Sequence, residues 1–320
     1  MFKIQTGHIH TGIIRLLMLS LVCFTTMLMT VSAQTIQETP GDQIAFAANK
    51  DGDYDIYLMD KDAVILGQLT DNNAQDVSPN WSPDGTQLVF ASNVDGDYDI
   101  YSIDMESGKS TNLTNNSWDD IAPSWSPDGK QIAFTSNRNT NWDLYVMDAD
   151  GKNPQRLTED PVFEGYSSWS PDGKQLVYVR DRDELRDIMV LDIASGEQQV
   201  LTERPTSADF SPAWSPNGDQ IAFVSSRSGN ADIFVVDTSC IGDSEQCDAT
   251  AVNLTADNLG SDLDPAWSPD GKQIMFASAG DNNTELFTVD LETGEITQFT
   301  HTSFDDRFPA WWGVVADNNN

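Results

Sequence analysis

The feature that most constrains this chain is a five-residue motif, Trp-Ser-Pro-Asp-Gly, that returns along it at a nearly constant interval. Four copies match it fully, one has asparagine in place of aspartate, and the last tryptophan is followed by Trp-Gly. The six tryptophans are Trp81, Trp125, Trp169, Trp214, Trp267 and Trp311. Successive positions are 44, 44, 45, 53 and 44 residues apart. Self-similarity at this period predicts a repeat architecture built from small units that pack on one another.

Each unit contains four segments with the composition of short β-strands. The first strand runs up to the tryptophan and ends in a Pro-Asp-Gly turn, since Pro fixes φ and Gly accepts positive φ. The second strand is apolar, as in Ile132-Ala133-Phe134, and the third begins like Asp143-Leu144-Tyr145. The fourth ends on Leu-Thr, as at Leu157. Short strands of this composition and spacing predict a four-stranded antiparallel blade.

The two ends of the repeat array predict how the units are closed into a ring. The first copy starts at its second strand, near Ile44, and the last copy stops after its tryptophan strand, residues 307–315. The first copy lacks its tryptophan strand, and the last copy consists of a tryptophan strand without the other three. We therefore predict an all-β fold, a six-bladed β-propeller over residues 43–315, in which the C-terminal strand completes the first blade and protects the sheet edges. Residues 34–42 form a polar lead-in, and residues 316–320 a frayed polar tail.

Residues 1–33 have the pattern of a secretory signal peptide. Lys3 and Arg15 flank the start of an almost wholly apolar run over residues 16–31, and Ala33 ends a small-x-small cleavage pattern. A retained membrane anchor is the alternative, because the apolar run approaches spanning length. We expect an exported protein that is periplasmic or extracellular.

The charge of the exported part bears on its partners. Residues 1–33 carry two of the 17 basic residues and no acid, which leaves 51 acidic and 15 basic residues, a net charge of −36. Such a chain repels phosphate backbones and anionic lipids, so we expect no nucleic-acid partner and no membrane insertion of the mature chain. It attracts cations and basic protein segments, although the same charge also keeps an exported protein soluble. We expect a monomer that binds a protein or peptide.

An insertion in the fifth unit holds the two cysteines that remain outside residues 1–33, Cys240 and Cys247. It falls in the hairpin between the third and fourth strands, where added length costs little. Exported proteins meet oxidising conditions, so we predict that the pair forms a disulfide. A ring of about eight residues contributes roughly 2.5 kcal/mol in the chain-entropy description.

The residues from Asp120 to Thr158 carry the repeat most clearly and read D…P-x-WSPDG-K-Q-IAF-x-S-N…LT. This pattern resembles the WD40-like (PD40) propeller repeat of the TolB family, over roughly residues 42–312. The resemblance implies a propeller and, because TolB is a periplasmic component of the Tol–Pal system, a binding role in the cell envelope. TolB has a separate α/β domain ahead of its propeller, whereas only about ten residues stand here between the expected cleavage site and the first strand. Similar repeats also form the propeller of prolyl-oligopeptidase-like peptidases, in which a hydrolase domain accompanies the ring.

The sequence offers little for catalysis. Outside residues 1–33 the one histidine is His301, with no evident orienting partner, and there is no G-x-S-x-G, H-E-x-x-H or phosphate-binding glycine loop. The runs Asn49–Asp55 and Asp95–Asp99 resemble calcium loops, but the glycine falls too early for an EF-hand and the final glutamate is missing. We interpret both as tight turns and predict no catalytic residue, no metal site and no cofactor, with Ca²⁺ or another cation as an open alternative.

An acidic residue stands five positions before each tryptophan. We name these six residues the entrance acids: Asp76, Asp120, Glu164, Asp209, Asp262 and Asp306. If the tryptophan strand is the innermost of each blade, the entrance acids ring one mouth of the central channel and attract a cation or a basic segment. The alternative is that they cap backbone N–H groups at the start of each strand.

The loops that lead into the entrance acids differ among the copies and carry aromatic residues. These are Trp118, Phe163, Tyr166 and Phe304. Aromatic residues on variable loops of a rigid scaffold are typical of recognition sites, although some of them could pack between blades instead. In the fourth unit Ser167 replaces the usual proline, and three arginines form a cluster that pairs with neighbouring acids or binds an anion. They are Arg180, Arg182 and Arg186.

We therefore expect an exported, non-enzymatic propeller that binds a protein or peptide in the cell envelope through the channel mouth. One alternative is an enzyme or enzyme accessory of the polysaccharide-lyase or peptidase type. A cluster of unlike residues inside the channel would favour it. Another alternative is a Ca²⁺-dependent surface-binding module, which calorimetry with Ca²⁺ would distinguish.

Overall fold

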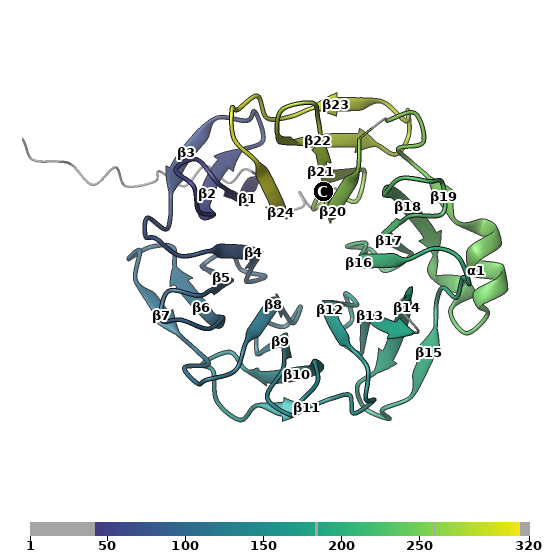
Figure 1. The fold of residues 1–320 in the computed structure, drawn as a ribbon, viewed down its shortest axis with the longest axis horizontal. Coiled ribbons are helices and arrows are strands. Elements are labelled where there is room, and N and C mark those ends of the chain that lie inside the picture. Colours follow the sequence, from purple (N-terminus) through teal and green to yellow (C-terminus); the bar gives the residue numbers. More distant parts are fainter. Residues whose placement is uncertain (1–41, 183–184, 259, 314–320) are drawn as a thin grey trace, which may run out of the picture. The chain divides into compact units, whose positions relative to one another are not determined.

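The computed structural model describes residues 42–182, 185–258 and 260–313. They form six four-stranded antiparallel sheets arranged as a ring around a central channel (Figure 1). The six-bladed architecture is therefore confirmed. The expected signal peptide (residues 1–33), almost all of the lead-in and the tail lie outside the described residues. Among the described residues, no helix has the length and apolar character needed to cross a membrane.

The first three blades, from the channel outward, have the following strands (Figure 1). The first blade contains β24 (Asp306–Trp312), β1 (Gln43–Ala48), β2 (Asp55–Asp60) and β3 (Ile65–Gln68). The second contains β4 (Asp76–Trp81), β5 (Gln87–Ser92), β6 (Asp99–Asp104) and β7 (Ser110–Asn112). The third contains β8 (Asp120–Trp125), β9 (Gln131–Ser136), β10 (Asp143–Asp148) and β11 (Gln155–Arg156).

The other three blades repeat this order. The fourth contains β12 (Glu164–Trp169), β13 (Gln175–Arg182), β14 (Leu185–Asp192) and β15 (Gln198–Val200). The fifth contains β16 (Asp209–Trp214), β17 (Gln220–Ser225), β18 (Asp232–Asp237) and β19 (Val252–Asn253). The sixth contains β20 (Asp262–Trp267), β21 (Gln273–Ala279), β22 (Thr284–Asp290) and β23 (Ile296–Gln298).

The ring is closed by the two ends of the repeat array, as predicted. The C-terminal strand β24 pairs antiparallel with β1, with Gln43 opposite Trp312 and Ile44 opposite Trp311. Beyond this ladder, Asn49 Nδ2 donates to Asp305 Oδ2 at 3.0 Å, and the Asp305 N–H donates to Asn49 Oδ1 at 2.8 Å. The first blade therefore depends on contacts between residues more than 250 positions apart.

The repeated tryptophan joins each blade to the one before it. Trp169 is buried at the end of the innermost strand, and its Nε1 donates to the backbone oxygen of Ser124 in the third blade at 3.1 Å. Trp81 makes the same bond with Ala310 across the closure at 3.1 Å. A large apolar ring with one polar atom can fill the space between two sheets and still satisfy its N–H. Trp267 makes the same bond with Ala213 at 3.0 Å, whereas Nε1 of Trp125 and of Trp214 has no partner. Packing of the ring between two sheets is therefore what recurs in every blade.

The Ser-Pro-Asp-Gly turn has its own internal bonds. Ser82 Oγ donates to Asp84 Oδ1 at 2.7 Å and accepts the Gln87 N–H at 2.9 Å. Gly85 has a φ of 70°, which residues with a side chain rarely adopt. The motif thus fixes a tight hairpin between the first and second strands.

The predicted disulfide between Cys240 and Cys247 is present in the structure. The insertion around it forms a 3-10 turn, η1 (Thr238–Cys240), and one short helix, α1 (Ser244–Thr250), on the outside of the fifth blade (Figure 1). Both cysteines are buried in the apolar core shared by the fourth and fifth blades. The insertion is therefore attached to the ring by packing as well as by the covalent bond.

Candidate functional site

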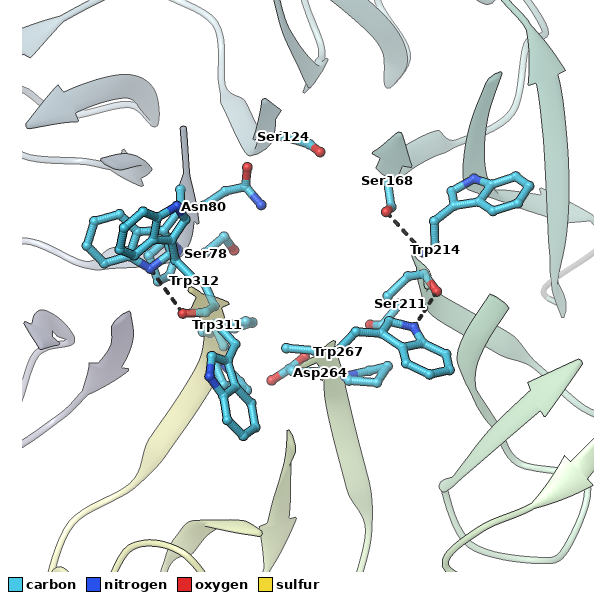
Figure 2. A pocket seen from close by; sticks show the side chains of 18 of the residues that line it. Ser78, Asn80, Ser124, Ser168, Ser211, Trp214, Asp264, Trp267, Trp311 and Trp312 are labelled. Atoms are coloured by element: carbon cyan, nitrogen blue, oxygen red, sulfur yellow. Dashed lines mark hydrogen bonds between the residues drawn. The ribbon is translucent and has the colours of Figure 1, made fainter. Parts of the chain in front are cut away.

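The innermost strands enclose a cavity of about 420 Å³ in the channel, towards the tryptophan ends of the strands (Figure 2). Each of the six innermost strands contributes its last residues to the lining. The lining mixes small polar residues such as Ser78 with prolines, and it contains one exposed aromatic side chain, Tyr166. A concave surface with a few polar and aromatic groups is the usual place for a ligand to bind.

A bulge in every innermost strand determines which side chains reach the cavity. The residue two positions after each entrance acid has φ between 50° and 55°, and the pairing with the second strand shifts register there. We name these the bulge residues: Ser78, Ala122, Tyr166, Ser211, Asp264 and Phe308. All six line the cavity. A positive φ in a residue with a side chain is unfavourable, and such strain recurs at binding sites.

The bulge residues make the cavity asymmetric, although the framework around them repeats. Serine or alanine stands at this position in three blades, while the other three carry tyrosine, aspartate and phenylalanine. Arg307 Nε donates to Asp264 Oδ2 at 2.8 Å, across the boundary between the sixth and first blades. The same guanidinium lies 4.9 Å from the ring of Phe308. One side of the channel thus has an ion pair beside an aromatic ring.

A group of aromatic side chains surrounds the fourth-blade bulge. The rings of Tyr166 and Phe163 are 5.6 Å apart, and Phe163 lies 6.3 Å from Trp142. Arg186 lies 5.8 Å from the Phe163 ring, and its Nε donates to Asp181 at 3.1 Å. Tyr166 is 38% exposed. Of the predicted aromatic residues, Tyr166 therefore lines the cavity, and Phe163 contacts it from the core shared by the fourth and fifth blades.

The other two predicted aromatic residues lie elsewhere. Trp118, on the loop before β8, is 45% exposed and does not line the cavity. Phe304 packs against the apolar core between the sixth and first blades. His301 is exposed and does not line the cavity either. The binding role predicted for Trp118 and Phe304 stays a prediction.

The entrance acids begin the innermost strands, as expected, but their side chains are buried instead of forming an exposed collar. In every blade but the fifth, the residue four positions before the acid donates to its carboxylate. Asn116 Nδ2 donates to Asp120 and Asn258 Nδ2 to Asp262, both at 2.7 Å. The donors in these two contacts are side-chain amides, whereas the capping alternative expects backbone N–H donors, such as that of Asp160 to the Glu164 carboxylate at 3.3 Å. Direct binding of a partner by the entrance acids stays a prediction.

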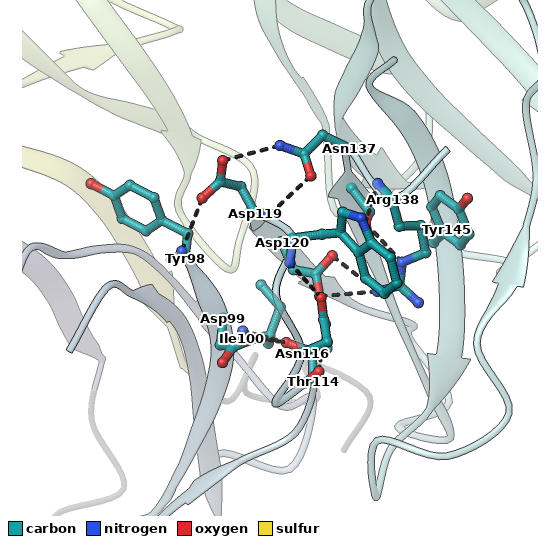
Figure 3. Close-up of polar contacts among 12 residues, drawn as sticks. Tyr98, Asp99, Ile100, Thr114, Asn116, Asp119, Asp120, Asn137, Arg138 and Tyr145 are labelled. Atoms are coloured by element: carbon teal, nitrogen blue, oxygen red, sulfur yellow. Dashed lines mark hydrogen bonds and ion pairs between the residues drawn. The ribbon is translucent and has the colours of Figure 1, made fainter. Parts of the chain in front are cut away.

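Two of the entrance acids have an arginine partner on the turn that follows the neighbouring strand. Arg138 Nη2 contacts both carboxylate oxygens of Asp120 at 2.9 Å, and the guanidinium carbon lies 4.7 Å from the centre of the Tyr145 ring (Figure 3). Arg227 Nη2 contacts Asp209 at 2.9 Å in the fifth blade. An ion pair with this geometry offsets part of the cost of burying each charge.

Two entrance acids without arginine have strongly raised pKa values. Burial raises the pKa of Asp262 to about 6, against hydrogen bonds from Ser278 and Thr255 that lower it. Burial and the charge of Glu285 raise the pKa of Asp306 to about 7, while a hydrogen bond from Thr300 lowers it. Protonation of these side chains in the folded protein therefore falls near neutral pH.

We expect the protein to unfold at a higher temperature at pH 5 than at pH 8. Asp262 and Asp306 bind protons more tightly in the folded state than at their ordinary pKa of 3.8. The stabilisation by protonation is complete below that ordinary value and is lost as the pH rises through about 6 to 7. Calorimetry at the two pH values measures the effect, and Asp306→Asn should reduce it. An equal or higher unfolding temperature at pH 8 would contradict this assignment.

The sequence analysis missed three residues that line the cavity, Ser78, Asp264 and Phe308. It also missed Arg307, which pairs with Asp264, and Trp142, which contacts Phe163. Most of them could have been identified by looking for a position that varies among the six copies of an otherwise constant strand. The six copies carry serine, alanine, tyrosine, serine, aspartate and phenylalanine two positions after the entrance acid. Among the described residues, three carboxylates that could hold a metal ion also meet on the first blade, outside this cavity.

Solved structures with the same fold include proteins of two kinds. TolB from Acinetobacter baumannii matches with a TM-score of 0.74 and 24% identity, over 86% of this chain and 67% of that one. A putative TolB from Agrobacterium tumefaciens matches with a TM-score of 0.66 and 23% identity, over 82% and 90% of the two chains. An oligogalacturonate lyase in complex with manganese matches with a TM-score of 0.54 and 18% identity, over 81% and 74%. These likenesses concern the fold.

No curated protein matches the sequence significantly. The family described as PD40, TolB beta propeller domain, matches residues 37–120 and 113–202, which together are more than half of the chain. The matched residues include the first three full copies of the motif and the strands around them. This chain belongs to the PD40 family of TolB β-propeller domains.

Proposed function

We propose that this propeller is an exported, non-enzymatic binding module of the cell envelope that holds a protein or peptide with a basic segment in its channel. The observation that carries the proposal is the asymmetry of the bulge residues. A repeated, rigid framework presents different side chains at six equivalent positions around one cavity. A purely structural role would favour the same side chain in every blade, whereas recognition needs unlike ones.

The chemistry of the lining suits a cationic side chain. Tyr166 and Phe308 offer aromatic faces, on which a Lys or Arg head group can lie. Asp264 adds a carboxylate at the cavity wall. Its Oδ2 already accepts a hydrogen bond from Arg307 Nε. The net charge of −34 for the whole chain draws basic segments towards it before contact.

Export and an envelope location are supported by two observations of different kinds. Residues 1–33 have the charge, apolar run and cleavage pattern of a signal peptide. The buried disulfide between Cys240 and Cys247 is typical of proteins that fold in an oxidising compartment. The fold similarity to two TolB proteins agrees with both.

An enzyme is the second candidate, and the same asymmetry favours it. Arg307, Asp264 and Tyr166 are unlike groups that line or border one cavity, and a lyase shares the fold. Incubation of the protein with oligogalacturonates and Mn²⁺, and separately with a mixture of peptides, distinguishes the two. The binding proposal expects no product in either reaction, and turnover that Tyr166→Ala abolishes would overturn it.

We expect Tyr166→Ala to weaken binding of a basic peptide by about tenfold or more, because an exposed aromatic anchor in a cavity carries a large share of the binding energy. Peptides are first selected from a random library on the wild-type protein, and their affinities are then measured by calorimetry. Selection should enrich Lys and Arg.

Trp118→Ala is the matched control, since it removes an exposed aromatic side chain outside the cavity. Its affinity should stay within about twofold of the wild type. If Trp118→Ala loses binding while Tyr166→Ala keeps it, the outer loops bind the peptide and the channel does not.

A further inference from the structure

Three carboxylates of the first blade converge at a place that the channel does not include. Asp51 lies in the loop between β1 and β2, Asp55 begins β2, and Asp71 follows β3. One oxygen from each lies within 4.8 Å of the others. Asp55 is fully buried, whereas Asp51 and Asp71 are exposed. The group therefore combines one buried carboxylate with two that solvent and ions can reach.

A buried hydroxyl without a partner points to a ligand at the same place. Tyr57 is 6% exposed, and its hydroxyl oxygen has no hydrogen-bond partner in the described structure. Tyr57 stands two residues after Asp55 on β2, so the two side chains lie on the same face of the strand. In the second blade the equivalent carboxylate and hydroxyl, of Asp99 and Tyr101, are close enough to contact the same donor, Asn112 Nδ2. Buried tyrosine hydroxyls normally have a partner. A water molecule bound to a cation at the three carboxylates would accept this hydrogen bond.

The third blade shows what occupies the equivalent place when the chain supplies it. Arg156 stands opposite Tyr145 on the outermost strand, as Gln68 stands opposite Tyr57 in the first blade. Its Nη2 contacts Asp143, the residue equivalent to Asp55, at 2.8 Å. A positive charge from the protein thus lies against the buried aspartate of this blade.

In the second blade an amide fills the same position. Asn112 Nδ2 donates to Asp99 at 2.8 Å and also to the Tyr101 hydroxyl at 3.0 Å, so both buried groups are satisfied. In the first blade, Gln68 Nε2 donates to Asp55 at 2.9 Å but leaves the Tyr57 hydroxyl without a partner. A threonine hydroxyl also donates to the buried aspartate in both blades, from Thr70 to Asp55 at 3.2 Å and from Thr114 to Asp99 at 3.0 Å. The first blade therefore differs in its unpartnered tyrosine hydroxyl and in a third carboxylate, Asp71, where the second blade has an asparagine.

We propose that Asp51, Asp55 and Asp71 bind one divalent cation of the Ca²⁺ type, in the position that the Arg156 guanidinium has in the third blade. Hard divalent cations take oxygen ligands, and Ca²⁺ accepts an irregular set of six to eight that can include water on the open side. Three carboxylates supply the charge. The proposal does not depend on what the channel binds.

The position of this site connects it to closure of the ring. Asp51 stands two residues after Asn49, whose backbone N–H and side chain both bond to Asp305 just before β24. A cation that fastens the Asp51 loop to Asp71 also holds this contact in place. Bound cation should therefore stabilise the propeller as a whole, because β24 and β1 form one sheet.

The test is thermal unfolding of the purified protein in EDTA and in millimolar CaCl₂. We expect Ca²⁺ to raise the unfolding temperature of the wild type by about 5 °C, and titration calorimetry to give about one ion per chain. The double variant Asp51→Asn/Asp71→Asn should lose the shift. Both side chains are exposed, so the variant should fold.

The control variant Asp95→Asn/Asp281→Asn removes the same charge at the positions of Asp51 in the second and sixth blades and should keep the shift. Gln68→Arg, which copies the third blade, should abolish the shift and raise the unfolding temperature in EDTA. The proposal is overturned if the wild type does not respond to Ca²⁺, if Asp51→Asn/Asp71→Asn responds as the wild type does, or if the control loses the response equally.

Discussion

A chain that ends at Asp305, and so lacks β24, is expected to lose cooperative folding. This strand is the innermost one of the first blade, and the backbone oxygen of its Ala310 accepts Trp81 Nε1 at 3.1 Å in the second blade. Its removal exposes the whole edge of β1 and opens the ring at the channel. Open edges of this kind pair with other molecules, so aggregation should follow. Calorimetry and size-exclusion chromatography measure the loss of the unfolding transition and of the monomer.

The matched control is a chain that ends at Gly313, which keeps the whole of β24. It should unfold cooperatively within a few degrees of the full chain. If the chain that ends at Asp305 also gave a sharp transition near that temperature, the propeller would be stable without its closing strand. Closure by β24 would then not be what makes the six blades fold as one unit.

Replacing Arg227 with alanine is expected to destabilise the protein by about 3 to 5 kcal/mol, because it leaves buried carboxylates without their positive partner. The Arg227 side chain is only 9% exposed and contacts Asp209 at 2.9 Å and Asp248 at 3.3 Å. It also lies 5.3 Å from the Phe223 ring and 4.8 Å from the Phe234 ring. Urea unfolding monitored by tryptophan fluorescence gives the change in free energy.

Lys130→Ala is the comparison, since Lys130 forms an ion pair of similar length, 2.9 Å with Asp128, but both side chains are largely exposed. Exposed pairs contribute about 0 to 1 kcal/mol, so this variant should be close to the wild type. A loss below about 1 kcal/mol in Arg227→Ala would mean that Asp209 accepts burial without its arginine, for example by taking up a proton.

The fold could be predicted from the sequence because one physical requirement recurs in every blade. The tryptophan that fills the space between two sheets returns six times, and the Ser-Pro-Asp-Gly turn follows it with little change in five of them. The spacing therefore fixed the number of blades, and the unequal ends fixed the closure by β24. The pairing of Cys240 and Cys247 followed from their number and the expected compartment.

The candidate site could be predicted only in part. Alternation along a strand would place Asp76 and Ser78 on the same face, but the bulge at Ser78 breaks this alternation and sends the two side chains to different environments. Sequence reasoning has no direct signal for that bulge. It therefore placed the entrance acids at the channel surface, and of the bulge residues it identified Tyr166 alone.

Burial of the entrance acids also depends on contacts with residues far along the chain, which the sequence alone does not reveal. Arg138 stands 18 residues after Asp120, and Arg227 stands 18 residues after Asp209, on the turn that follows the neighbouring strand. The first, second and sixth blades have lysine, valine and glycine at the equivalent position, so no pattern common to all blades pointed to these pairs. The three carboxylates of the first blade likewise come from separate stretches of the chain.

The most direct test of the central claim is site-specific photocrosslinking in cells of the organism that makes the protein. A photoreactive residue at Ala122, which lines the cavity, is compared with one at Ile65 on the outermost strand of the first blade. We predict that the Ala122 position captures a protein or peptide partner, that Tyr166→Ala abolishes the adduct, and that Ile65 captures none. Capture from Ile65 alone, or an adduct at Ala122 that survives Tyr166→Ala, would contradict the channel as the binding site.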